Sequence, residues 1–304
     1  MSKIIFLINA NSGVSSKFHL PALIEKSAAK HQKEFEIIFT KSGDEAIEKT
    51  KSAVAQNAFA VVAVGGDGTA NMIAQNLIHS GTALGIIPVG SGNGLARHLG
   101  ISLKPKLAIE NMFSGKIISI DTADVNGHLV LSNFGVGFLA DVVHSFHRSR
   151  LRGYVAYALH TFKKYFDSQN VKLKISVATG SPSGDHVADK VGDKLFDDEF
   201  FFVSVCNANQ FGYEIKLAPD ASLIDGLLEF YFVKKISALA KISLLIKVLR
   251  GKSYGFSKSE LIKAESAEVN FSGKLKAQID GDPIHISSPA KIQIQKLSLR
   301  VIVP

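Results

Sequence analysis

Short apolar runs alternate with amphipathic stretches over the first third of the chain. The apolar runs are rich in Val, Ile and Ala, as buried strands are, and they lie at residues 3–9, 34–40, 60–64 and 83–89. Between them, apolar side chains recur at the three- and four-residue spacing of a helix, over residues 18–31, 44–56 and 70–79. Strands that alternate with helices predict a doubly wound, Rossmann-like α/β domain with a parallel sheet.

The pattern changes after residue 116, where apolar and polar residues alternate. This two-residue period is typical of strands with one buried face, and the pair Asn126-Gly127 is a strong hairpin signal. Residues 179–198 are polar and predict a loop. The alternation continues in five further stretches, at residues 171–177, 200–206, 227–232, 261–271 and 275–286. The second part of the chain is therefore predicted to be an antiparallel β-sandwich.

These two patterns predict two domains. The nucleotide-binding α/β domain covers residues 1–120, and residues 292–304 are a candidate return to it. The β-sandwich domain covers residues 121–291. A chain of 304 residues is long enough for two hydrophobic cores. Its hydrophobic fraction of 46% and charged fraction of 20% exclude disordered, collagen-like and disulfide-rich classes.

We expect the chain to work in the cytoplasm, with transient contact at the inner face of the membrane. The sequence has no signal-peptide pattern, and Cys206, its only cysteine, cannot form an internal disulfide. An apolar strand surrounds Cys206, which predicts a core position. The most apolar stretch, residues 236–249, contains two lysines and is shorter than the ~18 apolar residues that span a bilayer.

The formal net charge of +8 favours partners that carry phosphate, such as nucleotides, nucleic acids or an anionic membrane surface. The chain has 20 Phe, 6 Tyr and no Trp, and most of these rings lie in apolar runs rather than beside Lys or Arg. That distribution disfavours a surface on which single-stranded nucleic acid could stack. We therefore expect no nucleic-acid partner.

Glycine-rich segments follow the third and fourth predicted strands. They are Gly65-Gly66-Asp67-Gly68-Thr69 and Gly90-Ser91-Gly92-Asn93-Gly94. Glycines let the backbone approach a phosphate, and the N-terminus of a following helix offers N–H donors. Asn9 and Thr40 end the first two strands, so four strand ends are predicted to converge at one edge of the sheet. The alternative is that the glycines only form tight strand-to-helix turns.

Two carboxylates flank a glycine in Asp280-Gly281-Asp282. Such a pair could supply a general base together with a group that orients it or holds a metal. Asp-Gly is also a common hairpin turn, so the spacing alone leaves both interpretations open. The same two alternatives apply to the segment around Asp225-Gly226.

Five motifs together resemble the diacylglycerol kinase catalytic-domain family. In chain order they are NANSG, VVAVGGDGTAN, LGIIPVGSGNGLAR, LAPDASLIDGLLEF and QIDGDPI. The family includes bacterial diacylglycerol kinases, YegS-like lipid kinases, sphingosine kinases and ceramide kinases, and the resemblance covers nearly the whole chain. It implies an α/β domain followed by a β-sandwich, and transfer of the γ-phosphoryl group of ATP to a lipid hydroxyl with Mg²⁺ as cofactor.

The resemblance also assigns roles to individual residues. Asp282 would be the base that accepts the lipid hydroxyl proton, with Asp280 beside it. A structural Mg²⁺ site in the β-sandwich would use the side chain of Asp225 and the backbone carbonyls of Ser222 and Leu227. The residues implied to contact ATP are Asn9, Asn11, Ser12, Gly13, Thr40, Gly65, Gly66, Asp67, Gly68, Thr69, Asn71, Ser91, Gly92 and Asn93.

Five positions depart from the family pattern. Ala10 replaces a proline, Met72 stands where Glu is common, and Gly94 stands where many bacterial diacylglycerol kinases have Asp. Asp282 is one methylene shorter than the usual Glu, and Tyr213 stands where glycines usually occur.

Residues 144–164 combine basic side chains, among them Arg148, Lys163 and Lys164, with an apolar middle. Such a segment can rest on an anionic membrane, and the alternative is a solvated helix packed over the sandwich. His144 and His147 have no third metal ligand at a suitable spacing, so we predict surface or capping roles for them.

These observations predict an ATP-dependent lipid kinase that acts on a diacylglycerol-like or sphingoid lipid at the membrane surface. A homodimer is compatible with this prediction. One alternative is an NAD kinase, because the Gly-Gly-Asp-Gly-Thr loop is similar there. The other is a non-catalytic regulator that binds a nucleotide or an anionic lipid.

Overall fold

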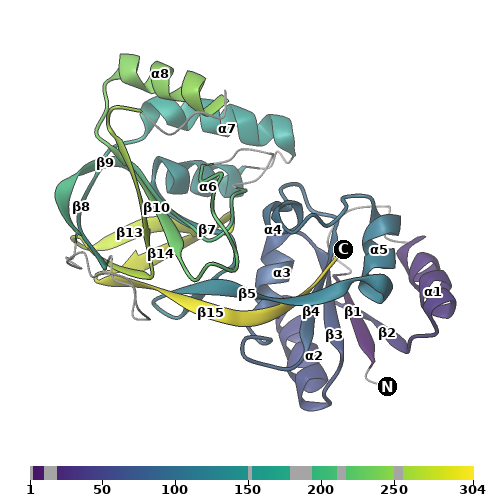
Figure 1. Ribbon diagram of the computed structural model, residues 1–304. Helices are drawn as coiled ribbons and strands as arrows, with labels where there is room; N and C mark the ends of the chain where they lie inside the picture. The colour runs from purple at the N-terminus through teal and green to yellow at the C-terminus, as the bar shows by residue number, and fades with distance from the viewer. Residues whose placement is uncertain (1–2, 10–18, 150–152, 179–193, 211–216, 250–255) are drawn as a thin grey trace. The chain divides into compact units, whose positions relative to one another are not determined.

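The computed structural model of the chain describes residues 3–9, 19–149, 153–178, 194–210, 217–249 and 256–304 (Figure 1). The chain divides into two compact units. The first consists of Met1–Ile120 together with Leu297–Pro304, and the second of Asp121–Lys296. Two strands, β5 (Lys116–Val125) and β15 (Ala290–Val303), contribute residues to both units.

The first unit is built on a parallel sheet in the order β4-β3-β1-β2, and the end of β15 pairs in parallel with β4 at Val301 and Leu84. β1, β3 and β4 are almost wholly buried, as the apolar runs predict. The elements of this unit are β1 (Ile4–Asn9), α1 (Leu20–His31), β2 (Phe35–Thr40), α2 (Gly43–Ala55), β3 (Ala60–Gly65), α3 (Asp67–Ala74), β4 (Ala83–Pro88), α4 (Gly94–His98) and α5 (Pro105–Ser114).

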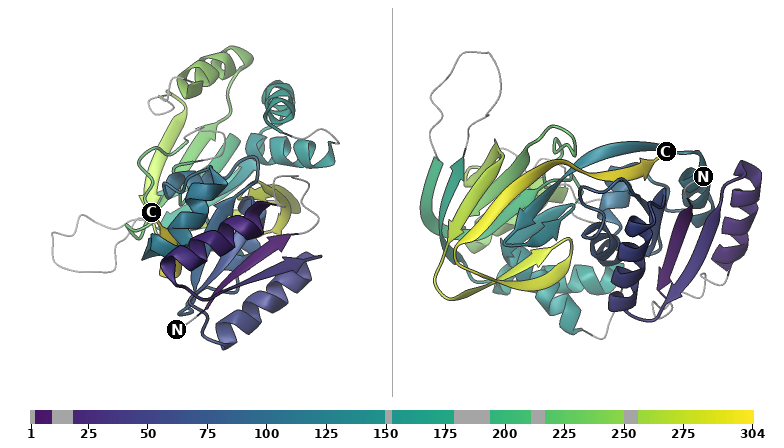
Figure 2. Two further views of the ribbon diagram at one scale, coloured as in Figure 1. Left: turned by 90° about the vertical axis from the view of Figure 1, so that its right-hand side faces the viewer. Right: turned by 90° about the horizontal axis from the view of Figure 1, so that it is seen from below.

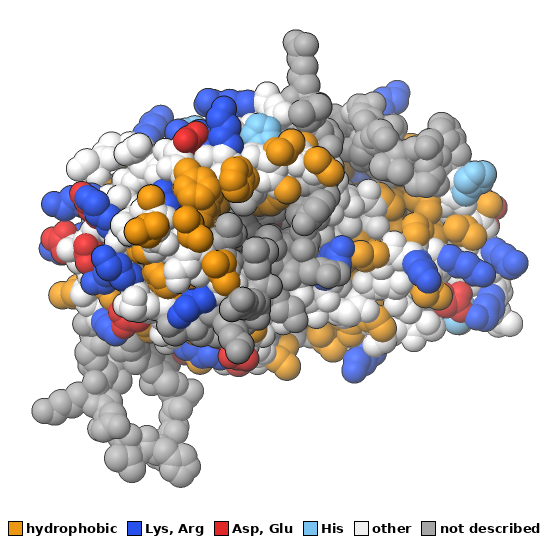
Figure 3. Space-filling view, turned by 90° about the horizontal axis from the view of Figure 1, so that it is seen from above, with side chains coloured by type: hydrophobic (Ala, Val, Ile, Leu, Met, Phe, Trp, Pro, Cys, Tyr) orange, Lys and Arg blue, Asp and Glu red, His pale blue; other side chains and the backbone are white. Residues whose placement is uncertain are grey.

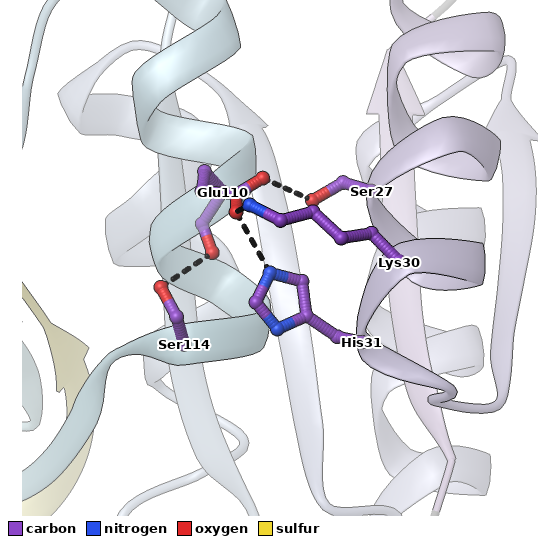
Figure 4. Close-up of polar contacts among 5 residues, drawn as sticks. All are labelled: Ser27, Lys30, His31, Glu110 and Ser114. Carbon is purple, nitrogen blue, oxygen red and sulfur yellow. Dashed lines mark hydrogen bonds and ion pairs between the residues drawn. The ribbon is translucent and has the colours of Figure 1, made fainter.

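Helices cover both faces of this sheet. α1 packs against α5 on one face and α2 against α3 on the other (Figures 1 and 2). A polar cluster joins α1 to α5, in which Glu110 accepts a hydrogen bond from Ser27 Oγ at 2.8 Å, lies 2.8 Å from His31 Nε2 and pairs with Lys30 (Figure 4). These partners, Lys30 first, lower the pKa of the Glu110 carboxyl from 4.5 to about 2.

This shift predicts how the first unit responds to acid. A carboxylate whose pKa is depressed by folding stabilises the fold fully above its ordinary pKa of 4.5, and this contribution is lost as the pH falls towards about 2. Because the cluster is partly exposed, we expect Glu110→Gln to lower the melting temperature at pH 7 by only about 2–4 °C. The difference between the wild type and the variant should shrink steadily between pH 5 and pH 2. A difference that stays constant over this range would contradict the assignment.

The second unit is antiparallel and follows the strand order β14-β13-β7-β9-β8-β12-β15. β9 pairs with β8 through its first half and with β7 and β10 through its second, and β10 also pairs with β11. The remaining elements are β6 (His128–Val130), β7 (Asn133–Gly137), α6 (Phe138–Arg148), α7 (Tyr154–Asp167), β8 (Val171–Ala178), β9 (Lys194–Cys206), β10 (Leu228–Lys234), α8 (Ala238–Leu249), β11 (Ser259–Ala264), β12 (Ser266–Asn270), β13 (Lys274–Ile279) and β14 (Asp282–Ser287).

The predicted fold class, an α/β domain followed by an antiparallel β-sandwich, is confirmed. The hairpin at Asn126-Gly127 joins β5 to β6, with Val125 opposite His128. Three details of the prediction were wrong. β9 begins at Lys194, so the last residues of the predicted loop 179–198 form a strand, and each of the predicted strands 261–271 and 275–286 is divided into two by a turn.

Two aromatic-rich regions form the interior of the second unit. One lies within the sandwich and includes Phe134, Phe200 and Phe230. The other, which includes Phe138, Phe201 and Tyr231, lies where α6, α7 and α8 pack on the sheet. Cys206 is buried there as predicted, and burial raises the pKa of its thiol to about 12, which suits a core residue rather than a nucleophile. No helix among the described residues is long and apolar enough to cross a bilayer.

Candidate functional site

The four parallel strands of the first unit end in register. Asn9 lies opposite Thr40, and Gly65, the last residue of β3, lies opposite Pro88. The predicted convergence of these strand ends at the carboxyl edge of the sheet is therefore present for Asn9, Thr40 and the two glycine segments. Open α/β sheets bind ligands at this edge. Asn11, Ser12 and Gly13, together with Ala10, lie outside the described residues.

The two glycine segments pack against each other with their backbones. A Cβ atom added to Gly90 would lie 2.5 Å from Gly66 Cα, and one added to Gly65 would lie 2.4 Å from Thr69 Oγ1. No residue larger than glycine fits at Gly90 without moving the other segment. The glycines therefore do more than form turns, because they allow two loops to meet at the start of α3, where the N-cap residue Gly66 has no side chain. Such a helix N-terminus suits a phosphate.

Polar side chains fix the second glycine segment. Asn93 has a left-handed backbone with a φ of 52°, and its side chain both accepts from the Gly90 N–H at 3.1 Å and donates to the Gly90 carbonyl at 2.7 Å. Asp67 Oδ1 accepts from the Leu95 N–H at 3.4 Å, which ties the first segment to the second. Arg97 Nε donates to the Gly92 carbonyl at 3.2 Å. A guanidinium thus lies beside this loop, a feature that the predicted set of site residues did not include.

In the second unit, Asp280-Gly281 forms the hairpin turn between β13 and β14. Both residues have positive φ angles, 52° and 89°, and Ile279 lies opposite Asp282. The turn interpretation is therefore correct for these two residues. The Asp280 carboxylate accepts three backbone hydrogen bonds, at 2.7–2.9 Å, from the N–H groups of Leu131, Ser132 and Asn133. Asp280 is thus placed to hold the turn against the strand beside it.

Asp282 is the first residue of β14, and as a whole residue it is exposed to solvent. The surrounding protein desolvates its carboxylate, which raises the pKa of Asp282 above its ordinary value of 3.8, and the charge of His147 opposes this shift. A carboxylate with a raised pKa is a better proton acceptor than an ordinary one. The prediction that Asp282 is the base thus has an electrostatic basis.

His144 differs from its prediction. It was expected at the surface or at a helix cap, but it is buried, and its Nε2 lies 3.0 Å from the Ala277 carbonyl and 3.1 Å from the Ile284 carbonyl. These two residues face each other across the β13–β14 hairpin. His144 therefore fastens α6 to the hairpin that carries Asp282.

The segment predicted to hold a structural metal is anchored by Asp121, which the sequence did not single out. The buried Asp121 carboxylate accepts from the Gly226 N–H at 2.8 Å, and its own N–H donates to the Leu223 carbonyl at 2.6 Å. Asp225 Oδ1 accepts from the Leu227 N–H at 3.1 Å, and Asp225 Oδ2 lies 3.6 Å from Lys263 Nζ.

Glu229 places a further carboxylate near Asp220 and Asp225, and the sequence analysis did not predict it. Its side chain is buried, with Oε1 3.1 Å from Lys263 Nζ and Oε2 without a hydrogen-bond partner among the described residues. Burial raises the pKa of Glu229, Lys263 opposes the rise, and Asp220 and Asp225 add to it. A buried carboxylate oxygen on β10, beside the acidic segment that precedes this strand, is a ligand type that suits a divalent cation.

A metal ion in this segment would need backbone carbonyl oxygens as ligands in addition to carboxylates. In the part of the chain that the structure describes, no three His, Cys, Asp or Glu side chains are grouped as a metal site. A hard cation is often held by one or two carboxylates together with carbonyls and water. The predicted set of Asp225 with the carbonyls of Ser222 and Leu227 is of this kind.

Two protein-family models match this chain, one over each of its two parts. The sequence model of the diacylglycerol kinase catalytic domain matches residues 3–125. The model of the YegS C-terminal NAD kinase beta sandwich-like domain matches residues 134–303, which is more than half of the chain. This chain belongs to the diacylglycerol kinase family.

Individual members of the family are similar over most of their length. A diacylglycerol kinase from Bacillus subtilis is 28% identical over 289 residues, which cover 93% of this chain and 90% of the relative. A diacylglycerol kinase from Staphylococcus saprophyticus is 26% identical and covers 80% of this chain and 76% of its own length. A Bacillus anthracis crystal structure, whose name as a diacylglycerol kinase is provisional, shares the fold with a TM-score of 0.81 at 19% identity, covering 100% of this chain and 95% of its own.

The departures from the diacylglycerol kinase pattern can be placed where the structure describes them. Met72 lies on α3, and a Cβ at Gly43, the first residue of α2, would meet its sulfur at 3.2 Å. Met72 therefore belongs to the packing between these two helices. Gly94 begins α4 and is buried. Tyr213 lies outside the described residues.

Proposed function

We propose that this diacylglycerol kinase family member transfers the γ-phosphoryl group of Mg²⁺-bound ATP to the hydroxyl group of a diacylglycerol-like or sphingoid lipid. The observation that carries the proposal is the contact between the two glycine segments at the carboxyl edge of the parallel sheet. Names of relatives that include diacylglycerol kinase and lipid kinase support the lipid as acceptor.

The first unit would bind the nucleotide. Phosphoryl transfer depends mainly on positioning and on neutralising charge, which backbone N–H groups, a cation and Mg²⁺ can supply. The segments at Gly65–Thr69 and Gly90–Asn93 would hold the phosphates, together with Asn9 and Thr40 at the same edge and Asn71 on α3. The Arg97 guanidinium would add positive charge beside them. When bound, Mg²⁺ would offset the negative charge of the phosphates.

The second unit would supply the base. Asp282 would accept the proton of the lipid hydroxyl as its oxygen bonds to the γ-phosphorus, while the bond from that phosphorus to the ADP oxygen breaks. The raised pKa of Asp282 favours this proton transfer. Asp280 would act as a positioning residue, because its carboxylate is engaged by three N–H groups that hold the turn.

The loop at Ser222–Leu227 would hold a structural Mg²⁺ ion. We expect Mg²⁺ at about 100 times its Kd to raise the melting temperature of the wild type by about 5 °C, since a ligand of the folded state stabilises it by mass action. Asp225→Ala should remove most of this rise. Asp197→Ala, which changes an exposed carboxylate on β9 of the same unit, should retain it. Equal Mg²⁺ responses in wild type and Asp225→Ala would exclude Asp225 as a ligand.

The experiment that tests the proposal is transfer of label from γ-labelled ATP to diacylglycerol, monoacylglycerol, sphingosine and ceramide in separate mixed-micelle reactions, with NAD as a parallel acceptor. Label in a lipid supports the lipid kinase. Label in NAD alone would replace the proposal by an NAD kinase. ATP binding without transfer to any acceptor would replace it by a regulator.

A further inference from the structure

Helices α7 and α8 expose two apolar stripes. On α7, Val155, Leu159, Phe162 and Phe166 are spaced by three or four residues and are 42–70% exposed. On α8, Leu239, Ile242 and Ile246 are spaced in the same way and are 44–80% exposed. Apolar residues at this spacing lie on one face of a helix. Seven large apolar side chains on two helices exceed the scattered exposure expected of a monomer surface.

The two helices are fastened side by side. The Tyr165 hydroxyl of α7 donates to the Lys241 carbonyl of α8 at 2.5 Å, and Lys241 Nζ lies 3.4 Å from the Phe166 carbonyl. The Lys241 ammonium also lies 4.4 Å from the centre of the Phe201 ring in the core below. The two stripes thus lie on neighbouring, tied helices, and we call them together the α7–α8 face. Figure 3 shows hydrophobic side chains gathered over these helices.

Basic side chains accompany the α7–α8 face. The two helices carry four lysines and one carboxylate, Asp167. Lys163 is exposed and Lys164 and Lys247 are partly exposed, whereas Lys241 is buried. An apolar stripe bordered by lysines is the arrangement with which a surface helix enters the boundary of an anionic bilayer.

We propose that the α7–α8 face docks on an anionic lipid bilayer, with the apolar side chains among the acyl chains and the lysines at the headgroups. The inference rests on the proposed function, because a kinase for a membrane lipid must reach a substrate that stays in the bilayer. It extends that function by naming the surface that would contact the bilayer, and this surface includes α8, which is too short to span a bilayer. Charge complementarity favours an anionic bilayer over a second copy of this basic chain.

Vesicle sedimentation without ATP tests this proposal separately from the kinase chemistry. We expect the wild type to bind vesicles of equal parts phosphatidylglycerol and phosphatidylcholine at least tenfold more tightly than pure phosphatidylcholine vesicles, with weaker binding at high salt. Phe162→Ser combined with Leu239→Ser should lower binding to the anionic vesicles at least tenfold. Lys163→Gln combined with Lys164→Gln should remove most of the preference for the anionic lipid.

The matched control is Leu195→Ser, which removes an equally exposed leucine from β9 in the same unit and should leave binding unchanged. Melting temperatures and light scattering of all variants accompany the sedimentation. Equal binding of the wild type and of Phe162→Ser with Leu239→Ser would overturn the proposal. A wild-type dimer that this double variant converts to a monomer, without any vesicle binding, would overturn it in favour of a contact between two copies of the chain.

Discussion

Asp282→Asn should lower the rate of phosphoryl transfer by about 10²–10⁴-fold, the range that a positioned general base contributes. Asparagine has nearly the same shape as aspartate but cannot accept the hydroxyl proton at neutral pH. The turn should stay in place, because it is held by Asp280 and not by Asp282. ATP affinity should remain within about twofold of the wild type, since the predicted phosphate-binding segments belong to the first unit.

The pH dependence and a conservative variant separate a base from a structural residue. Because partial desolvation of the carboxylate raises the pKa of Asp282, kcat/KM of the wild type should fall in acid through a pKa above the ordinary value of 3.8. Asp282→Glu restores the residue of the family motif and should keep a measurable rate with an acidic limb. Full activity of Asp282→Asn, or the same acidic limb in that variant, would exclude Asp282 as the base.

Gly90→Ala should raise the dissociation constant of ATP at least about tenfold and lower the melting temperature by several degrees. The added Cβ would lie 2.5 Å from Gly66 Cα and 3.2 Å from Gly66 N, so backbone must move and the two glycine segments must separate. It would also lie 3.0 Å from Asn93 Oδ1, which holds the second segment in shape. Calorimetry or a fluorescent ATP analogue measures the change.

Gly81→Ala is the matched control for Gly90→Ala. Gly81 lies in the same unit, and a Cβ added there meets no atom within 4 Å. This substitution should leave both the ATP affinity and the melting temperature nearly unchanged. If Gly90→Ala bound ATP as the wild type does, the glycine segments would be turns only, and the proposed phosphate site would be wrong.

The buried parallel strands were the most predictable part of the fold. β1 to β4 begin and end within two residues of the runs that predicted them. β1, β3 and β4 are covered on both faces and are therefore apolar almost throughout, whereas β2, at the edge of the sheet, is only partly buried and contains Glu36. α5 was missed although Pro105 begins it and Ala108, Ile109, Met112 and Phe113 are buried at helical spacing.

The sequence predicted where the candidate site residues lie in the chain, but it did not predict the hydrogen bonding or the pKa shift of each side chain. Asp280 and Asp282 differ by two residues, yet three N–H groups engage the first while the second is desolvated. That difference depends on the strand beside the turn, more than 140 residues earlier in the chain. Glu229 and Asp121 were missed for the same reason, since each acquires its partners only through distant parts of the sequence.

The measurement that tests the central claim most directly is a competition reaction. All acceptors are mixed with γ-labelled Mg²⁺-ATP, the lipids are extracted, and the mass of the labelled product is determined for the wild type and for Asp282→Asn. The account predicts one phosphorylated lipid class in the extract of the wild type and at least about a hundredfold less of it with Asp282→Asn. A wild-type extract without labelled lipid, from a protein that binds ATP, would contradict the assignment of this chain as a lipid kinase.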